Sequence, residues 1–239
     1  MYNIDVDNLT RTFGAFTAVD HITFQVKKGE IFGFLGANGA GKTTAMKMMC
    51  GLLAPTSGKA TIAGYDLKTQ SRYIKENIGY MSQRFSLYND LSLFENMQLY
   101  GTIYKIEKRL LKDRIHDSLC ELGMEQHINK MVGSIPLGWK QKLAFATAML
   151  HRPQVVFLDE PTSGVDPIVR REFWGQIYAT AATGVTIFVT THYMDEAEYC
   201  GRLSIMSHGQ LKIIGTPEEI KTEMGVDSIG EVFGKFVQR

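Results

Sequence analysis

Residues 36–43 read Gly-Ala-Asn-Gly-Ala-Gly-Lys-Thr, a complete G-x-x-x-x-G-K-[ST] phosphate-binding loop. Glycines in such a loop let backbone N–H groups turn toward a triphosphate, and the helix that follows adds its partial positive charge. The Lys42 ammonium is expected to reach the β- and γ-phosphates, and the Thr43 hydroxyl to ligate Mg²⁺. The sequence therefore predicts a nucleotide site whose contacts are Gly36, Asn38, Gly39, Ala40, Gly41, Lys42, Thr43 and Thr44.

Two adjacent carboxylates, Asp159 and Glu160, directly follow the apolar run Val155–Leu158. An acid at the carboxyl end of a parallel strand lies where α/β sheets bind their ligands. Asp159 is then placed to hold Mg²⁺ through water, and Glu160 to polarise an attacking water as a general base. The alternative is an acidic pair that only ends a strand at the surface, and the phosphate-binding loop argues against it.

Two further polar residues follow apolar, strand-like runs. His192 comes after Val185–Val189, where it would contact the γ-phosphate and orient Glu160. Gln83 ends the run that starts at Ile78, and its neutral amide is able to ligate Mg²⁺ or a water. An isolated histidine or glutamine is more often structural, so both assignments depend on the loop and the acidic pair.

Strand and helix patterns alternate along the chain and supply the elements that would position these residues. Ile31–Leu35 is an apolar strand before the loop, and residues 44–53 suit a helix after it. Residues 1–30 have the alternation of antiparallel strands, and residues 85–150 have helical spacing, including a helix over 140–150. The pattern predicts an α/β fold with a mixed, largely parallel core sheet, an N-terminal antiparallel β subdomain and an inserted α-helical subdomain.

Length and composition are those of an ordinary globular chain. The 239 residues, 44% of them hydrophobic, are enough for a full core in one domain over 1–239. Lys and Arg number 26 against 25 Asp and Glu, and this balance predicts no nucleic-acid partner. Cys50, Cys120 and Cys200 are widely separated and predict reduced thiols. No apolar run approaches the ~20 residues that cross a bilayer, and the N-terminus lacks the pattern of a signal peptide.

Taken in order, these residues resemble the motifs of the nucleotide-binding domain of ATP-binding cassette (ABC) proteins, which have a P-loop NTPase fold. The resemblance assigns family motifs to the residues already singled out, namely Walker A to 36–43, the Q-loop to Gln83, Walker B to 155–160 and the switch histidine to His192. It also implies that residues 161–167 form the D-loop, whose Asp166 would belong to the nucleotide site, and that Phe13 stacks on adenine. Ordinary core packing is the alternative for Phe13.

One segment departs from the family pattern, where the signature reads Leu-Ser-Gly-Gly-Gln. The chain has Ile135-Pro136-Leu137-Gly138-Trp139 there, so Pro136 offers neither the serine hydroxyl nor an N–H, and Leu137 replaces a glycine. The resemblance implies that signature groups reach the γ-phosphate held by a partner cassette, and Gly138 is the contact of this kind that remains. We expect transition-state stabilisation across the dimer to be weakened but not abolished.

The variant signature and the segment Pro-Thr-Ser-Gly-Val-Asp-Pro are similar to those of drug-export ATPases of the daunorubicin-exporter type. The resemblance implies an ATPase that powers a membrane exporter, with ATP and Mg²⁺ as cofactors. It implies a transmembrane permease subunit and a second cassette as partners, the latter in a homodimer or as half of a tandem or heterodimer. Residues 84–88 are the expected docking groove, residues 216–239 a C-terminal helical tail, and the expected location is cytoplasmic, on the inner face of the membrane.

Two other functions stay open at this point. A soluble, non-transport ABC ATPase that acts on ribosomes or DNA usually carries coiled-coil insertions or basic linkers, and the sequence has neither. A weakly hydrolysing, nucleotide-gated dimerisation module is suggested by the altered signature, but Glu160 and His192 argue against it.

Overall fold

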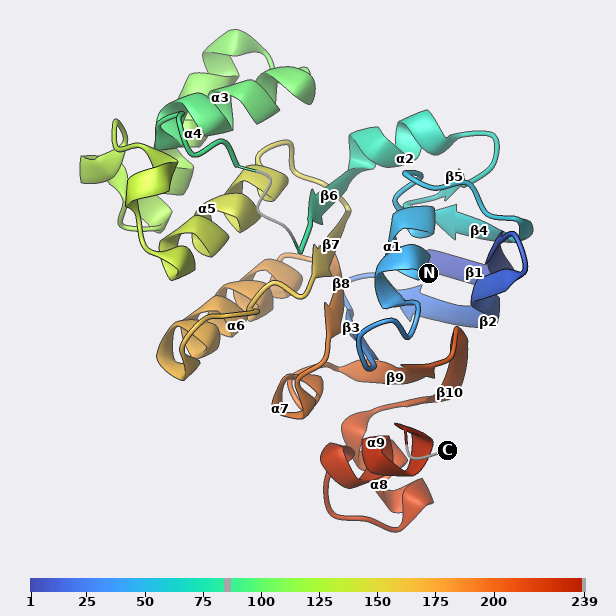
Figure 1. Cartoon of the computed structure of the whole chain (residues 1–239). Helices are drawn as coiled ribbons and strands as arrows, with labels where there is room; N and C mark the ends of the chain where they lie inside the picture. The colour runs from blue at the N-terminus through green and yellow to red at the C-terminus, as the bar shows by residue number, and fades with distance from the viewer. Residues whose placement is uncertain (84–86, 238–239) are drawn as a thin grey trace.

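The computed structural model describes residues 1–83 and 87–237, and Figure 1 shows two β-sheets with helices around them. The first sheet is antiparallel, in the spatial order β2-β1-β4-β5, and consists of β1 (Tyr2–Phe13), β2 (Phe16–Lys27), β4 (Ser57–Ile62) and β5 (Tyr65–Asp66). Ile22, Phe24 and Val26 of β2 are buried while their neighbours are exposed, as in a sheet with one solvated face. The antiparallel strands predicted for residues 1–30 are therefore confirmed.

The second sheet has the spatial order β10-β9-β3-β8-β7-β6. Its strands are β3 (Ile31–Leu35), β6 (Ile78–Met81), β7 (Val155–Asp159), β8 (Thr186–Thr191), β9 (Arg202–Ser207) and β10 (Gln210–Gly215). Neighbouring strands pair in parallel from β9 to β6, and β10 runs antiparallel to β9. This is the mixed sheet with a parallel core that the sequence predicts.

Both faces of the second sheet are covered, which explains why its central strands are apolar throughout. Successive side chains point to opposite faces, so Phe32 and Phe34 of β3 pack with helix α1 (Lys42–Met49) against the first sheet. Ile31 and Leu35 pack on the other face, in the core shared with the helices. Phe34 also meets Phe188 of β8 edge to face, with ring centroids 4.7 Å apart.

Three helices gather on the side of the molecule away from the first sheet (Figure 1). They are α3 (Leu93–Ile103), α4 (Lys108–Glu121) and α5 (Leu137–Met149), with short 3₁₀ turns at Glu125–His127 and Val132–Ser134. Helix α3 starts with a capping box, because Ser92 and Glu95 each accept from the other's backbone N–H. Helix α4 is followed by Gly123, whose φ of +66° suits a helix end.

The remaining helices are α2 (Ser71–Asn77), α6 (Pro167–Ala182), α7 (Met194–Ala197), α8 (Pro217–Met224) and α9 (Ile229–Val237). Helix α6 covers the sheet face that also packs on α5, through Phe173 and Trp174. Helices α8 and α9 lie next to β9 and β10 at the C-terminal end (Figure 1). Across residues 1–83 and 87–237, no helix has both the length and the apolar character needed to span a membrane.

Two helix boundaries differ from their predictions. The helix expected over 44–53 spans Lys42–Met49, because Gly41 enters it with φ +106° and Gly51, at φ +66°, turns the chain away after its end. The helix expected over 140–150 begins at Leu137, since Pro136 occupies the N-cap position and its fixed φ is compatible with a helix start.

Candidate functional site

The phosphate-binding loop connects the carboxyl end of β3 to the start of α1, the context that the motif requires. Two of its glycines are needed for close backbone approach. A Cβ at Gly36 would lie 2.6 Å from the Met206 carbonyl oxygen, and one at Gly41 would lie 2.4 Å from the Ala18 carbonyl oxygen. Gly39 instead has open space but φ +81°, a conformation that other residues rarely adopt. The loop conformation therefore depends on glycine at each of these positions.

Lys42 lies across this loop with only 4% of its surface exposed. Its Nζ donates to the carbonyl oxygens of Gly36 at 2.7 Å and Ala37 at 3.0 Å, and it lies 3.6 Å from Glu160 Oε1. Burial lowers the pKa of the Lys42 ammonium, and the carboxylate of Glu160 opposes that shift. A buried ammonium with one nearby carboxylate favours the approach of an anion, which suits a phosphate site.

Asp159, at the end of β7, accepts two hydroxyl hydrogen bonds on Oδ1. Thr43 Oγ1 donates at 3.1 Å and Thr190 Oγ1 donates at 2.6 Å. Burial raises the pKa of the Asp159 carboxyl, and the two hydroxyl donors oppose that shift. The oxygens of Thr43 and Asp159 thus lie together beside the phosphate-binding loop.

These oxygens fit Mg²⁺, a hard cation that binds one or two carboxylates and completes its shell with phosphates and waters. Among the described side chains, no three His, Cys, Asp or Glu residues form a cluster that could hold a metal. A magnesium ion at Thr43 and Asp159 would therefore need the oxygens of a bound nucleotide.

Glu160 is the point on which the other predicted residues converge. Gln83 Nε2 donates to Glu160 Oε2 at 2.8 Å, so the Gln83 amide contacts the predicted base rather than Asp159. His192 Nδ1 lies 3.0 Å from the same Oε2, close enough for an ion pair but without a hydrogen bond. Glu160 also has φ +49°, held by hydrogen bonds from its N–H to the carbonyl and hydroxyl oxygens of Thr190. Strained backbone of this kind is typical of functional sites.

One edge of the second sheet explains why these residues meet. Gln83 follows β6, Asp159 ends β7 with Glu160 directly after it, His192 follows β8, and the phosphate-binding loop follows β3. These strands are parallel neighbours, so their carboxyl ends lie at a single edge. The sequence does not identify Thr190, whose hydroxyl donates to Asp159. The signal in the sequence that could indicate it is a hydroxyl residue close to the end of an apolar strand.

The other predicted nucleotide contacts differ in their surroundings. Phe13 ends β1 and is 47% exposed, with the Arg11 guanidinium 4.5 Å from its ring centroid, so it is not a core residue. Within the loop, Asn38 and Gly39 are exposed, Ala40 is buried and Thr44 is partly buried.

Gly138, expected to reach a partner cassette, and Asp166, expected at the nucleotide site, both have contacts within this chain. Gly138 is buried at the start of α5, where an added Cβ would lie 2.5 Å from Val169 Cγ1 of α6. Asp166 caps α6, because its Oδ1 accepts from the N–H groups of Ile168 at 3.0 Å and Val169 at 3.1 Å. Pro136 and Leu137 are exposed beside them.

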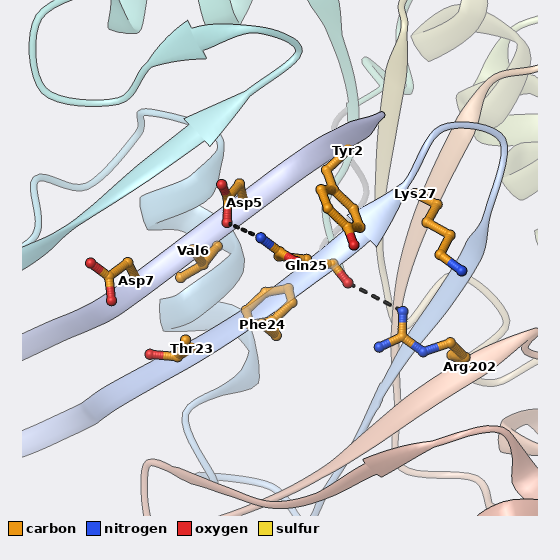
Figure 2. A pocket seen from close by; sticks show the side chains of 9 residues that line it. All are labelled: Tyr2, Asp5, Val6, Asp7, Thr23, Phe24, Gln25, Lys27 and Arg202. Atoms are coloured by element: carbon orange, nitrogen blue, oxygen red, sulfur yellow. Dashed lines mark hydrogen bonds between the residues drawn. The ribbon is translucent and has the colours of Figure 1, made fainter.

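A separate hollow of about 760 Å³ lies over β1 and β2, beside Arg202 of β9 (Figure 2). Several of its polar side chains pair with their neighbours: Gln25 Nε2 donates to Asp5 Oδ1 at 3.1 Å, and Arg202 donates to the Gln25 carbonyl at 3.3 Å (Figure 2). It contains none of the predicted site residues, so the chemistry of this chain lies at the sheet edge instead.

Comparison with known proteins agrees with this geometry. A family profile described as "ABC transporter" matches residues 19–163. The chain belongs to the ABC transporter family. A solved "ATP binding subunit of ABC transporter" superimposes on this ABC cassette with a TM-score of 0.87 over 98% of both chains, at 28% identity. This likeness extends over nearly the whole chain and agrees with the phosphate-binding loop and the carboxylates at the sheet edge.

Two relatives have recorded functional names. The ABC cassette is 47% identical over 224 residues to the "Probable multidrug ABC transporter ATP-binding protein YbhF" of Escherichia coli K12, which covers 94% of this chain and 39% of that protein. It is 33% identical over 227 residues to the "Linearmycin resistance ATP-binding protein LnrL" of Bacillus subtilis 168, covering 95% of this chain and 73% of that protein. The chain thus spans less than half the length of the first relative.

Proposed function

We propose that this cassette binds ATP at Gly36–Thr43 and hydrolyses it, with Glu160 as general base, to drive an ABC-type membrane exporter. The convergence of Gln83, His192 and Lys42 on Glu160, at 2.8, 3.0 and 3.6 Å, carries the proposal. A carboxylate held among these groups beside a phosphate-binding loop is suited to orient a water and accept its proton near the γ-phosphate.

The other residues would bind and orient the nucleotide. Lys42, now hydrogen-bonded to two loop carbonyls, would turn its ammonium to the β- and γ-phosphates. The backbone N–H groups of residues 36–44 would surround the phosphates, and the half-exposed Phe13 ring would stack on adenine. Bound Mg²⁺, held by Thr43 and Asp159 with help from Gln83, would neutralise phosphate charge. His192 would hold the γ-phosphate and keep Glu160 oriented.

A second cassette would complete the site, either an identical chain or the other half of a tandem or heterodimeric protein. The first turn of α5 supports this, because its N–H groups have no partner within the helix and Pro136 provides no side-chain cap. The backbone of Gly138 would approach the γ-phosphate held by the other cassette, with Asp166 nearby. Closure would then depend on ATP, since the phosphates would contact both cassettes.

Export through a permease is supported by the relatives' names, which specify multidrug transport and linearmycin resistance. The daunorubicin-exporter type is the finer assignment, supported by the variant signature. The predicted docking segment 84–88 includes residues 84–86, which lie outside the described residues. A hollow of about 790 Å³ that Ser82 helps to line has apolar and aromatic side chains, among them Leu52, Tyr80, Ile103 and Tyr104, and charged ones such as Arg72 and Lys105. It would suit a permease segment, and such docking would hold the cassette at the cytoplasmic face of the membrane.

ATP hydrolysis measured against chain concentration tests the proposal. We expect phosphate release per chain to rise with concentration, because each site needs a second cassette, and to stop when EDTA removes Mg²⁺. Lys42→Ala serves as the inactive control. If the chain releases no phosphate at any concentration, alone or with its partner cassette, the proposal is wrong. Co-purification with a membrane permease, rather than with ribosomes or DNA, tests the exporter assignment.

A weakly hydrolysing, nucleotide-gated dimerisation module is the second candidate, and the exposed Pro136 and Leu137 favour it. It predicts a dimer that forms with ATP and releases little phosphate. The two candidates therefore differ in turnover and agree in dimerisation.

A further inference from the structure

A buried carboxylate outside the proposed nucleotide contacts connects two parts of the site. Glu196, on α7, has no exposed surface. The hydroxyl of Thr162 donates to its Oε1, and Thr191 Oγ1 donates to its Oε2 at 2.6 Å. Arg170 Nε lies 3.4 Å from Oε1 and supplies a positive charge. Burying a carboxylate is costly unless it is paired and hydrogen-bonded, and here both oxygens are used.

The two threonines lie close in sequence to Glu160 and His192, Thr162 in the loop after β7 and Thr191 at the end of β8. The N–H of Ser163, the residue after Thr162, donates to the Glu160 carbonyl at 3.2 Å. Thr191 directly precedes His192, and its hydroxyl also accepts from the Tyr193 N–H at 3.0 Å. The Glu196 carboxylate therefore holds the backbone two residues after Glu160, and through Thr191 it holds the residues on either side of His192.

Helix α6 contacts the same carboxylate through Arg170, and helix α5 contacts the loop that contains Thr162. The Arg170 guanidinium of α6 lies 4.2 Å from the Tyr193 ring centroid and donates to Asp195 at 3.2 Å, so it holds the segment after His192. Gln141 Nε2 of α5 donates to the Ser163 carbonyl at 3.2 Å. The helix that begins at the variant signature thus contacts the loop that Glu196 holds.

We propose that Glu196 is a positioning residue for ATP hydrolysis: by holding Thr162 and Thr191 together it sets the placement of His192 against Glu160. The inference rests on the proposed function, because it needs Glu160 and His192 to act together. Glu196 has no exposed surface and both of its oxygens have partners within the chain, so its effect would be on the placement of groups rather than on direct binding of the nucleotide. An effect of this kind lowers kcat and leaves KM for ATP nearly unchanged.

Glu196→Gln tests this with little change in shape, because the amide group can accept from only one of the two hydroxyls. We expect kcat to fall about tenfold or more and KM to stay within about twofold. Glu198→Gln is the matched control, since Glu198 is an exposed carboxylate two residues away that pairs with Lys221. The control variant should keep the parent kcat.

Threonine variants provide a second test that does not alter Glu196. Thr191→Val removes the hydroxyl and keeps the shape, whereas Thr191→Ser keeps the hydroxyl. We expect Thr191→Val to lower kcat as Glu196→Gln does, and Thr191→Ser to keep most of the parent kcat. A double variant of Glu196→Gln and Thr191→Val should lose less than the product of the two single losses, because both remove the same hydrogen bond.

A residue that only stabilises the fold would lower the unfolding midpoint of Glu196→Gln and leave kcat per folded molecule at the parent value, which would overturn the proposal. Equal kcat for the Val and Ser variants of Thr191 would also overturn it. The NMR signals of the His192 ring provide a readout without turnover: they should shift in Glu196→Gln and stay in place in Glu198→Gln. A parent chain without ATPase activity would instead contradict the proposed function, and the His192 signals would still decide the placement.

Discussion

Two helix N-termini in this molecule face a phosphate in the proposed site, and they are built in opposite ways. Helix α1 begins inside the glycine loop, where Gly36 and Gly41 lie against the backbone of other strands and Lys42 is buried. Helix α5 begins at Pro136 without a side-chain cap, and Leu137, its first residue, is 43% exposed. Both ends have the partial positive charge of a helix start, yet only the first is enclosed by its own chain.

The difference indicates which half of the site this chain supplies by itself. Around α1, contacts within the chain fix the loop, the lysine and the oxygens of Asp159 and Thr43. Around α5, contacts within the chain fix only the inner side of the helix, where Gly138 meets Val169. The outer side of the helix start, with Pro136 and Leu137, is exposed and free to contact another cassette. Substitutions there should therefore alter ATP turnover more than folding.

The largest expected effect tests the half of the site around α1, which this chain encloses by itself. Glu160→Gln removes the proposed base, and we expect ATP turnover to fall about a thousandfold while an ATP-bound dimer accumulates. Phosphate release and size-exclusion chromatography with ATP measure the two effects. Glu172→Gln, which changes an exposed carboxylate paired with Lys142, is the control. Parent-like hydrolysis by Glu160→Gln would show that the base is elsewhere.

Gly138→Ala tests the inner side of α5. Its Cβ would lie 2.5 Å from Val169 Cγ1, and we expect the free energy of unfolding to fall by about 1–3 kcal/mol. Urea unfolding measures this loss. Adding Val169→Ala should recover most of it, because the clashing methyl is removed. If Gly138→Ala is as stable as the parent, packing does not require glycine there and a role in the partner's site becomes its main constraint.

Phe13→Ala tests whether the exposed Phe13 ring belongs to the ATP-binding half of the site around α1. Stacking of a base on an aromatic ring contributes about 1–3 kcal/mol, so we expect the Kd for ATP to rise about fivefold or more. Phe13→Tyr should keep the parent affinity. Phe16→Ala removes another exposed ring of the same hairpin, 63% exposed, and is the control. A titration that finds equal losses for Phe13→Ala and Phe16→Ala would remove Phe13 from the site.

The smallest expected effect concerns the outer side of α5. Pro136→Ser combined with Leu137→Gly restores a hydroxyl, an N–H and open space, and we expect kcat to rise about three- to tenfold. Pro136→Ala restores the N–H without the hydroxyl and separates the two contributions. ATPase rates at saturating chain concentration measure the gain. An unchanged or lower rate would mean that the variant signature is suited to a partner surface other than the family's usual one.

The sequence predicts the enclosed half better than the exposed one, for physical reasons. The glycine loop, Asp159, Glu160 and His192 each follow an apolar strand, and parallel strands bring such residues to one edge without further information. The fold class follows from the same alternation of strands and helices. The pattern does not predict where helices start, because α1 begins at Lys42 through the left-handed backbone of Gly41.

Contacts between distant segments escape prediction from one sequence. Nothing local to Glu196 indicates that Thr162 and Thr191 meet on its carboxylate. Likewise, Gly138 matches a signature glycine by position, and only the packing of α5 on α6 reveals its contact with Val169. Asp166 is similar: a motif names it, while the structure also shows an ordinary helix cap.

The left-handed backbone of Glu160 has a consequence for how the glutamate at this position is retained during evolution. A side chain at φ +49° carries strain that glycine would relieve, so the proposed base occupies a position where the fold alone does not favour it. Substitution by glycine would disable the chemistry without harming the architecture. Gene copies that are no longer selected for ATP turnover are therefore free to lose the glutamate and become stable proteins that bind ATP without hydrolysing it. Retaining the glutamate requires continued selection for turnover.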